Sequence, residues 1–410
     1  MNLYDYQEQN ALKGFEILQK NNLVYLHFEV RTGKTLTALE IAFLGKYQRV
    51  LFVTKKKATS SIMSDYNNFG YSLHFELTVI NYESLHKIDE PFDLIILDEA
   101  HVLGAFPKPA QRTKFVKSKY SKLPMIFLSG TPAVESSSQW YHQLYVSNYS
   151  PFSFYKNFYQ WAKDYVDVTK KHLGYGVIND YTNGRTAKIE HQIKDVVLTF
   201  TQEQAGFETK VNKNIVYCEM HPQTGVISKR LQKDNVVKGS TGTLTADSGV
   251  KLLNKVHQLS GGTVILDDDR SINIDYSKAN FIKETYKEKI AIFYYFKQEL
   301  ELLKEVYGDE LTTDLNEFNT TNKVIALQQY SGAEGISLKN ATKLIFYNWG
   351  MSGVKFIQAI DRMSTKDRLD NQVYFICGYE TISKKVLDRV LNKESYGVEQ
   401  FRRDYGNLSN

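Results

Sequence analysis

Residues 23–35, LVYLHFEVRTGKT, combine an apolar run, a short loop and the start of a helix. The apolar run at residues 23–28 predicts a strand. After Gly33, Lys34 and Thr35, apolar residues recur at three- and four-residue spacing, which predicts an amphipathic helix. The loop therefore joins a strand to the exposed N-terminus of a helix. Backbone N–H groups and the helix dipole at such an N-terminus bind anions, phosphates above all.

The loop departs from a complete phosphate-binding loop at its front. The full motif has a glycine five residues before Gly33, and that position is Phe28 here. In a phosphate-binding loop, Lys34 would reach the terminal phosphates as a point charge, and the Thr35 hydroxyl would ligate Mg²⁺. An ordinary capped helix is the alternative that this motif alone leaves open.

The composition is that of an ordinary folded protein. The 410 residues are 42% hydrophobic and 24% charged, and the chain is long enough for two or three domains. The N-terminus lacks a basic and apolar leader, and no run of 18 apolar residues occurs, so we expect an intracellular protein with no membrane partner. The two cysteines lie far apart, which argues against a zinc or disulfide framework.

A net charge of only +5 restricts any nucleic-acid affinity to local basic patches. Residues 100–134 form one such patch, because they carry no Asp or Glu and six basic side chains: Lys108, Arg112, Lys114, Lys117, Lys119 and Lys122. A solvated helix face is the ordinary explanation of such a run, and contact with phosphates is the alternative.

Short apolar runs separated by helical or polar segments fill the first 130 residues, at 23–28, 50–53, 77–80, 94–97 and 125–128. This pattern predicts a parallel sheet covered on both faces. Ligands of such sheets bind beyond the carboxyl ends of the strands. Polar residues follow these ends, namely Lys55 and Lys56, Asn81 and Tyr82, Asp98–Glu99–Ala100–His101, and Ser129–Gly130–Thr131–Pro132.

The two carboxylates Asp98 and Glu99 follow the apolar run LIIL. Such a pair at the end of a buried strand is costly unless a cation meets it, and the Mg²⁺ of a bound nucleotide is the natural candidate. Asp98 would hold the metal through water, and Glu99 would orient and deprotonate the attacking water. An acidic first turn of a helix is the alternative explanation.

The second half of the chain predicts further elements. Residues 149–165 are dense in aromatics at helical spacing, which favours a core stripe over base stacking. Residues 151–278 are interpreted as a connecting insertion with a hairpin of 263–266 and 271–274. Apolar runs at 290–294, 324–328, 344–347 and 373–376 alternate with helical segments and predict a second α/β lobe.

The order of the motifs resembles helicase superfamily 2, and within it the Snf-type DNA translocases. The six ordered motifs are Gln7 in a Leu-x-x-Tyr-Gln setting, Gly33–Lys34–Thr35, Asp98–Glu99–Ala100–His101, Ser129–Gly130–Thr131–Pro132, Ser331–Gly332–Ala333–Glu334–Gly335–Ile336 and Gln358–Ala359–Ile360–Asp361–Arg362. The resemblance implies an α/β fold of two RecA-like lobes, with residues 1–150 as the ATP-binding lobe, 151–278 as the insertion and 279–410 as the helicase C-terminal lobe.

The resemblance also assigns roles to residues. Catalysis falls to Glu99, Arg362, Lys34 and Gln358. ATP with Mg²⁺ would be held by Gln7, Arg31, Thr32, Gly33, Lys34, Thr35, Asp98 and Gly335, with the metal at Thr35 and Asp98. Coupling of hydrolysis to movement falls to His101, Ser129 and Thr131, and nucleic-acid contacts to Lys55, Lys56, Asn81, Tyr82 and Ser331.

Some positions depart from the pattern. Phe28 and Arg31 replace small residues of the phosphate loop, and Ser337 stands where related motors often have Asp. The second arginine that follows Arg362 in related motors is replaced by Thr365. We therefore expect Arg362 to be the principal arginine finger, with Lys366 a weaker auxiliary because a lysine lacks the bidentate fork, and with Arg368 contributing least.

The implied function is an ATP-dependent DNA translocase or helicase, similar to small phage-encoded members, in the cytoplasm of a bacterial or phage-infected cell. Its implied partners are duplex, forked or single-stranded DNA and proteins of replication or recombination. Two alternatives stay open: a nucleotide-gated clamp that closes on nucleic acid without unwinding it, and an RNA-directed ATPase of the same superfamily.

Overall fold

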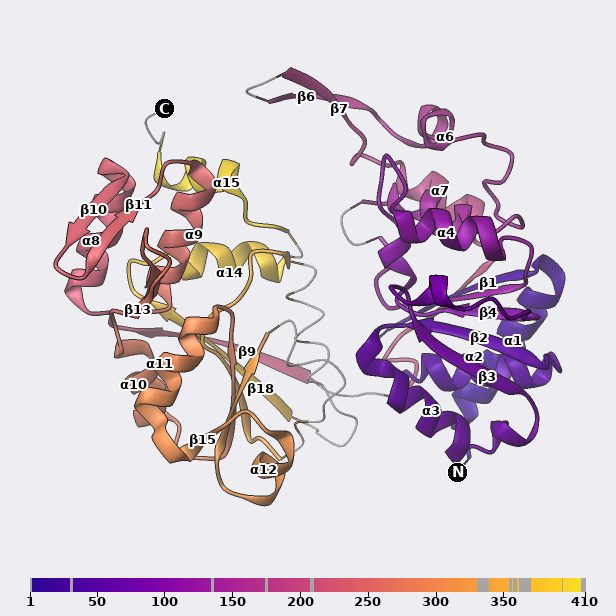
Figure 1. Ribbon diagram of the computed structural model, residues 1–410, viewed down its shortest axis with the longest axis horizontal. Coiled ribbons are helices and arrows are strands. Elements are labelled where there is room, and N and C mark those ends of the chain that lie inside the picture. The colour runs from indigo at the N-terminus through magenta and orange to yellow at the C-terminus, as the bar shows by residue number, and fades with distance from the viewer. Residues whose placement is uncertain are drawn as a thin grey trace. The chain divides into compact units, whose positions relative to one another are not determined.

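The computed structural model describes residues 2–29, 32–133, 136–173, 176–206, 210–329, 338, 340–353, 356, 360, 370–392 and 394–406. The chain divides into two compact units, Met1–Phe207 and Glu208–Asn410, each built around its own six-stranded parallel sheet (Figure 1). The α/β fold expected from the sequence is therefore confirmed.

The sheet of unit 1 has the strand order β3-β2-β4-β5-β1-β8. Its strands are β1 (Leu23–Phe28), β2 (Arg49–Thr54), β3 (Glu76–Asn81), β4 (Leu94–Leu97), β5 (Met125–Ser129) and β8 (Val197–Phe200). Its α-helices are α1 (Asp5–Asn21), α2 (Lys34–Leu44), α3 (Thr59–Asn68), α4 (Gln111–Tyr120), α5 (Gln139–Tyr145), α6 (Phe158–Tyr165) and α7 (Thr186–Ile193). Short 3₁₀ segments are η1 (Lys56–Ala58), η2 (Tyr71–Leu73), η3 (Leu85–Lys87) and η4 (Ala100–Leu103).

The inner strands β2, β4, β5 and β1 of unit 1 are mostly apolar because both faces of the sheet are covered there. Successive residues of a strand point to opposite faces. Tyr25 accordingly packs in one hydrophobic core, and its neighbours Val24 and Leu26 pack in the other. The two cores fix the strand register, so the polar residues after each strand end at one edge of the sheet.

The sheet of unit 2 has the order β15-β16-β14-β17-β18-β9. Its strands are β9 (Lys210–Cys218), β14 (Ile290–Tyr294), β15 (Leu311–Thr312), β16 (Val324–Gln328), β17 (Lys343–Phe346) and β18 (Asp370–Gly378). Its helices are α8 (Pro222–Asp234), α9 (Gly249–Ser260), α10 (Ser277–Thr285), α11 (Lys297–Tyr307), α12 (Leu315–Thr320), α14 (Ser383–Leu391), α15 (Val398–Tyr405) and the 3₁₀ segment η5 (Gly308–Glu310).

Three two-stranded antiparallel pairs lie outside the large sheets. They are β6 (Thr169–Leu173) with β7 (Gly176–Asp180), β10 (Val236–Gly239) with β11 (Gly242–Thr245), and β12 (Thr263–Ile265) with β13 (Ser271–Asn273). The last pair confirms the predicted hairpin. The aromatic stripe is confirmed as core for Phe158, Trp161 and Tyr165, which are buried, whereas Phe154 is exposed.

The boundaries expected at residues 150 and 278 differ from the observed division. Within the expected insertion, β8 pairs with β1 of unit 1, and β9 pairs with β18 of unit 2. Each is an edge strand whose partner is distant in sequence, so its place is set by tertiary pairing and not by local pattern. Among the described helices, none is long and apolar enough to cross a membrane.

Candidate functional site

The predicted phosphate loop joins β1 to α2, and its backbone turns at Gly33. Gly33 has φ 83°, in the left-handed region that favours glycine, and it precedes the first residue of α2. The Lys34 ammonium donates to the carbonyl oxygens of Phe28 at 2.9 Å and Glu29 at 3.0 Å. Thr32 Oγ1 donates to the same Glu29 carbonyl at 2.8 Å. The end of β1 thus holds the Lys34 charge at the N-terminus of α2.

Gln7 of α1 packs against this loop. Its side chain is 3% exposed, and its Oε1 accepts a hydrogen bond from the Tyr4 backbone N–H at 2.9 Å. A Cβ built on Gly33 would lie 1.9 Å from Gln7 Nε2, so the amide packs directly against the loop. The family resemblance places Gln7 among the residues that would hold ATP, and that role stays a prediction. In the structure the side-chain carbonyl of Gln7 is already bonded to Tyr4, and the contact with Gly33 makes Gln7 a support of the loop.

Asp98 follows β4 and makes three hydrogen bonds within unit 1. Its Oδ2 accepts a hydrogen bond from Thr54 Oγ1 at 2.6 Å, and its backbone N–H donates to Val53 at 2.8 Å. The Tyr82 hydroxyl donates to the Asp98 carbonyl at 2.8 Å. Burial raises the pKa of Asp98, and the Glu99 charge raises it further, whereas the Thr54 hydrogen bond and the Lys34 charge lower it. A cation here would relieve both effects that raise the pKa.

Glu99 lies next along the chain, between two basic side chains. Its Oε1 is 3.6 Å from Lys55 Nζ, and its Oε2 is 3.4 Å from His101 Nδ1. Its backbone is in the left-handed region, with φ 49°. The Glu99 side chain is 25% exposed, so its carboxylate is accessible to a water molecule.

The residues predicted to couple hydrolysis to movement are brought together. His101 Nδ1 lies 3.2 Å from Ser129 Oγ, which also accepts a hydrogen bond from the Thr131 N–H at 3.2 Å. Ser129 is fully buried at the end of β5. A continuous set of contacts therefore runs from Glu99 through His101 to the segment after β5.

Sequence reasoning missed several residues of this site. Thr54 was not singled out, although its hydroxyl orients Asp98. His27 on β1 pairs in register with Ser129, and burial and the Lys34 charge lower its pKa. The hydroxyl of Tyr25 donates to Gln143 Oε1 at 2.7 Å, and Gln143 Nε2 donates to the Pro132 carbonyl at 2.6 Å. An apolar run gives no local signal that His27 or Tyr25 faces a site.

The four nucleic-acid candidates of unit 1 have different environments. Lys56 is exposed, whereas Lys55 lies beside Glu99. Asn81 Oδ1 accepts from the Ser84 N–H at 2.8 Å, which caps a turn after β3. The prediction for Tyr82 needs correction. Tyr82 is 7% exposed because it packs in a hydrophobic core of unit 1, and its hydroxyl donates to the Asp98 carbonyl, so it supports the acidic pair.

The basic stretch at residues 100–134 borders an open groove of about 650 Å³. Arg112 and Lys114 of α4 and His86 of η3 line it, and Arg112 lies 3.8 Å from Glu83. Two further lysines are engaged within the unit. Lys117 Nζ donates to the Tyr145 carbonyl at 2.8 Å, and Lys119 pairs with Asp89 at 3.0 Å. The solvated-face explanation therefore holds for only part of this stretch.

The predicted residues of unit 2 and one of unit 1 lie outside the described part of the chain: Arg31, Ser331, Gly335, Ser337, Gln358, Arg362, Thr365, Lys366 and Arg368. Their roles stay predictions.

In unit 2 the described residues form a buried polar network. Glu299 Oε1 accepts from Asn348 Nδ2 at 2.6 Å, and Asn348 Oδ1 lies 3.0 Å from His257 Nε2. Glu299 Oε2 accepts from the N–H groups of Tyr295 and Phe296 at 2.8 and 2.9 Å. Burial raises the pKa of Glu299 to about 7 and lowers that of His257 to about 4. The network ties together the carboxyl ends of β14 and β17.

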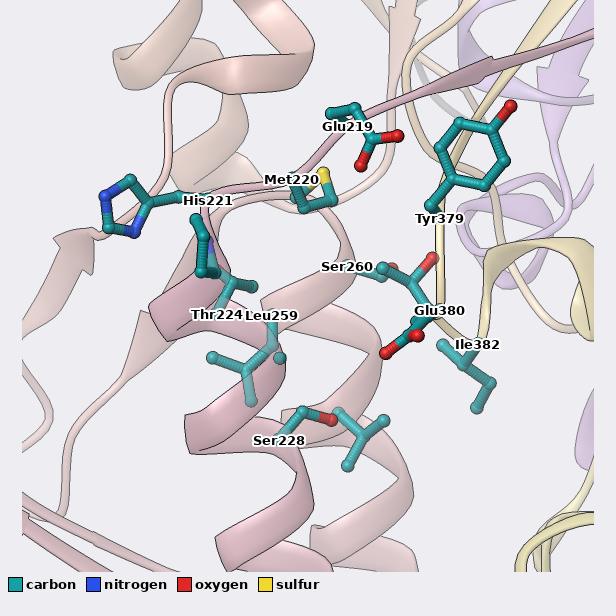
Figure 2. A pocket seen from close by; sticks show the side chains of 14 residues that line it. Glu219, Met220, His221, Thr224, Ser228, Leu259, Ser260, Tyr379, Glu380 and Ile382 are labelled. Carbon is teal, nitrogen blue, oxygen red and sulfur yellow. The ribbon is translucent and has the colours of Figure 1, made fainter.

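Unit 2 also has a pocket of about 380 Å³ at the carboxyl ends of β9 and β18 (Figure 2). Glu219 and His221 follow β9, and Tyr379 and Glu380 follow β18. Glu380 pairs with Lys229 at 2.9 Å. None of the described residues that line this pocket belongs to a predicted motif. Among the described residues no group of three or more His, Cys, Asp or Glu forms a metal site.

Comparison with known proteins adds a family match. The model of the SNF2-related domain matches residues 32–274, more than half of the chain. The Hef helicase domain of Pyrococcus furiosus is similar in fold, with a TM-score of 0.52 and 12% identity over 93% of this chain and 96% of that one.

A SWI2/SNF2 ATPase core of Sulfolobus solfataricus in complex with dsDNA matches with a TM-score of 0.43 and 16% identity, over 96% of this chain and 91% of that one. Among curated proteins no match was found.

Proposed function

From the premise that the chain belongs to the SNF2-related domain family, and is therefore an ATP hydrolase of the helicase type, we propose that it couples ATP hydrolysis to movement along DNA. The observation that carries the proposal is the meeting, at one edge of the unit 1 sheet, of the Lys34 loop with the carboxylates of Asp98 and Glu99. We propose replication, recombination or repair of DNA as the setting of this activity.

The residues of unit 1 fit a nucleotide with Mg²⁺. The N-terminus of α2 with Lys34 would bind the phosphates, and Thr35 and Asp98 would hold the metal. Bound Mg²⁺ supplies positive charge that neutralises charge developing on the phosphates. The raised pKa of Asp98 is consistent with a buried carboxylate arranged for a cation.

Glu99 is placed to act on the attacking water. Lys55 and His101 hold its two oxygens from opposite sides, at 3.6 and 3.4 Å, and leave the carboxylate partly exposed. Glu99 would orient the water and accept its proton, and the contact of His101 with Ser129 would carry the change to the segment after β5.

Contact with DNA is proposed to be mainly with phosphates. The exposed Lys56 and the exposed lysines and arginine of α4 supply positive charge without base-reading groups. Affinity should then fall steeply with salt, by about 0.9 units of log–log slope for each phosphate neutralised on a duplex, and should vary little with sequence.

The test is an ATPase assay with double-stranded, single-stranded and forked DNA and with RNA. We expect DNA to stimulate turnover. Lys34→Ala and Glu99→Gln should each lose about 100-fold or more, while Glu99→Gln keeps ATP binding. Lys13→Ala, an exposed lysine of α1, is the matched control.

Each alternative has its own outcome in this assay. Stimulation by RNA alone would favour the RNA-directed ATPase. ATP-dependent DNA binding without stimulated turnover would favour the clamp, and normal turnover by Glu99→Gln would contradict the role given to that residue.

A further inference from the structure

The β6–β7 pair is a two-stranded ribbon that projects from unit 1 near α6 (Figure 1). Its register runs from Thr169 opposite Asp180 to Leu173 opposite Gly176. In water an isolated two-stranded ribbon is only marginally stable. None of its described side chains belongs to a hydrophobic core of the described residues. Because core packing does not explain why the ribbon is extended, we expect its surface to have a function.

Each face of the ribbon carries one lysine and one exposed β-branched residue, and Asp180 at the end of β7 lies on the same face as Lys171. Adjacent residues of a strand point to opposite faces, and directly opposed residues share a face. Lys171 therefore shares one face with Ile178, and Lys170 shares the other face with Val177. Both lysines are exposed, and Val177 and Ile178 are 53% and 48% exposed. The one acidic side chain in residues 169–180 is Asp180, which accepts hydrogen bonds from the Thr182 N–H at 2.9 Å and the Thr182 hydroxyl at 2.8 Å.

The base of the ribbon is fastened to unit 1. Arg185 donates two hydrogen bonds to Asp167 Oδ1, at 2.9 Å from Nε and 2.7 Å from Nη2. Val166 and Gly184 form an antiparallel bridge, and the Asp167 N–H donates to the Asn183 carbonyl at 2.9 Å. These contacts fix the direction in which the ribbon leaves the unit.

The same base is bonded to the segment that follows the coupling residues. Ser136 Oγ donates to the Thr182 carbonyl at 2.6 Å, and Ser138 Oγ donates to the Tyr181 carbonyl at 2.7 Å. A Cβ on Gly184 would lie 2.4 Å from Ser137 Oγ, so the two backbones are in close contact. Ser136 lies four residues after Pro132, which is the last residue of the Ser129–Pro132 motif. The base of the ribbon is thus bonded to Ser136 and Ser138, which follow that motif in the sequence.

We propose that the β6–β7 ribbon binds DNA through both of its faces, and that its substrate is branched DNA whose two strands diverge around it. The proposal rests on the proposed function and names its substrate class. Lys170 and Lys171 would each meet a phosphate, one on each side, and Val177 and Ile178 would pack against sugars and bases. Residues 169–180 carry a net charge of +1, and each face of the ribbon offers one lysine to a phosphate.

Two-sided contact distinguishes this arrangement from binding in a groove. The major groove of an intact duplex admits a two-stranded ribbon, but a ribbon lying there turns only one face to the base edges. Only one of the two lysines would then face the groove floor. One lysine on each face favours a junction over an intact duplex.

The test compares binding of a DNA fork and of a blunt duplex of the same sequence over a series of salt concentrations. Lys170→Ala and Lys171→Ala should each lower the log–log salt slope for the fork by about 0.7–0.9, and at most one of them should affect the duplex. Val177→Thr/Ile178→Thr keeps the β-branched side chains and should weaken fork binding about fourfold for each methyl group removed from a contact.

The matched control is Lys13→Ala/Lys20→Ala, two exposed lysines of α1, which should leave fork binding unchanged. Basal ATPase activity without DNA should be unaffected in all of these variants, because the ribbon takes no part in the nucleotide site. Retained basal activity also shows that the variants are folded.

Three results would contradict the proposal for the ribbon without contradicting the proposed function. They are ribbon variants that bind the fork as well as the control does, equal losses on fork and duplex for both lysine variants, or a wild-type dimer that becomes monomeric in Val177→Thr/Ile178→Thr. Absence of any DNA binding or DNA-stimulated turnover by the wild-type chain would instead overturn the proposed function itself.

Discussion

At the scale of single residues, Glu99 shows how the site is kept in place. A left-handed backbone costs a residue with a Cβ about 1–2 kcal/mol, and Glu99 has φ 49°. Backbone hydrogen bonds on both sides, from Asp98 to Val53 at 2.8 Å and from Val102 to Glu99 at 3.0 Å, hold this conformation. The turn directs the Glu99 carboxylate toward Lys55 and His101 immediately after a straight, buried strand.

Thr54 gives a test of the acidic pair. Its hydrogen bond lowers the pKa of Asp98, so Thr54→Val should raise that pKa further and leave less of the charged form. Because a hydrogen bond to a charged group contributes about 1.5–3 kcal/mol, we expect turnover to fall about tenfold or more. The acidic limb of the pH–rate profile should move to higher pH.

The matched variant Thr54→Ser keeps the hydroxyl and should keep the profile of the wild type. An unchanged profile in Thr54→Val would mean that Asp98 does not depend on this hydrogen bond.

At the scale of elements, α5 connects several parts of unit 1. Gln143 joins Tyr25 of β1 to the Pro132 carbonyl after β5. One turn of the same helix places His142 Nδ1 2.7 Å from the Ala105 carbonyl, and the His142 ring stacks on Phe158 of α6. The helix thus links the coupling segment to the aromatic core from which the β6–β7 ribbon departs.

His142 makes the stability of unit 1 depend on pH. Burial lowers its pKa to about 4, although the Ala105 carbonyl raises it in part, while an unfolded histidine titrates near 6.5. Between these values the unfolded chain binds more protons. Stability is therefore fully present above pH 6.5 and is lost as pH falls toward 4, by up to about 3 kcal/mol.

His142→Phe should remove this loss of stability at acidic pH. The substitution also removes the hydrogen bond between the His142 ring and the Ala105 carbonyl. The measurement is urea denaturation between pH 4.5 and 7.5, followed by fluorescence. His191→Gln, an exposed histidine of α7, should behave like the wild type. If His142→Phe loses as much stability at acidic pH as the wild type does, titratable groups other than His142 cause the loss.

At the scale of the whole molecule, the predicted catalytic residues are divided between two units, each with its own sheet and hydrophobic cores. Each has a six-stranded parallel sheet with a hydrophobic core on each of its two faces. The phosphate loop and acidic pair belong to unit 1, and the predicted finger Arg362 belongs to unit 2. Folding and catalysis should therefore separate when the chain is divided.

Fragments 1–207 and 208–410 should each unfold cooperatively, and fragment 1–207 should lose about 10³-fold or more in turnover because it lacks Arg362. In the intact chain, Arg362→Ala should lose a similar factor while keeping ATP binding, Lys366→Ala less, and Arg368→Ala least. The measurements are circular dichroism melting and ATPase assays. Wild-type turnover by fragment 1–207, or equal losses for Arg362→Ala and Arg368→Ala, would contradict this assignment.

Much of the fold follows from local sequence pattern. The apolar runs at 23–28, 94–97 and 290–294 are strands with the predicted bounds, because a strand covered on both faces must be apolar at every position. The strand-end residues Lys34, Asp98 and Ser129 could be predicted to meet, since all strands of the unit 1 sheet are parallel and end at one edge.

Other features depended on contacts between segments far apart in the chain. The edge strands β8 and β9 join their sheets only through long-range pairing, so the sequence placed both in a connecting insertion. Tyr82 and Gln7 have side chains suited to ligands, and packing buried both as supports of Asp98 and Gly33.

By itself, then, the amino-acid sequence determined the kind of elements, their order and the motifs at the strand ends, because these depend on periodicity and residue type over short stretches. Only the tertiary structure decided which side chains face the site, which are buried behind it, and that the β6–β7 ribbon projects from a base bonded to Ser136 and Ser138. The physical reason is that burial, hydrogen-bond partners and exposed faces are set by neighbours that the sequence places far away.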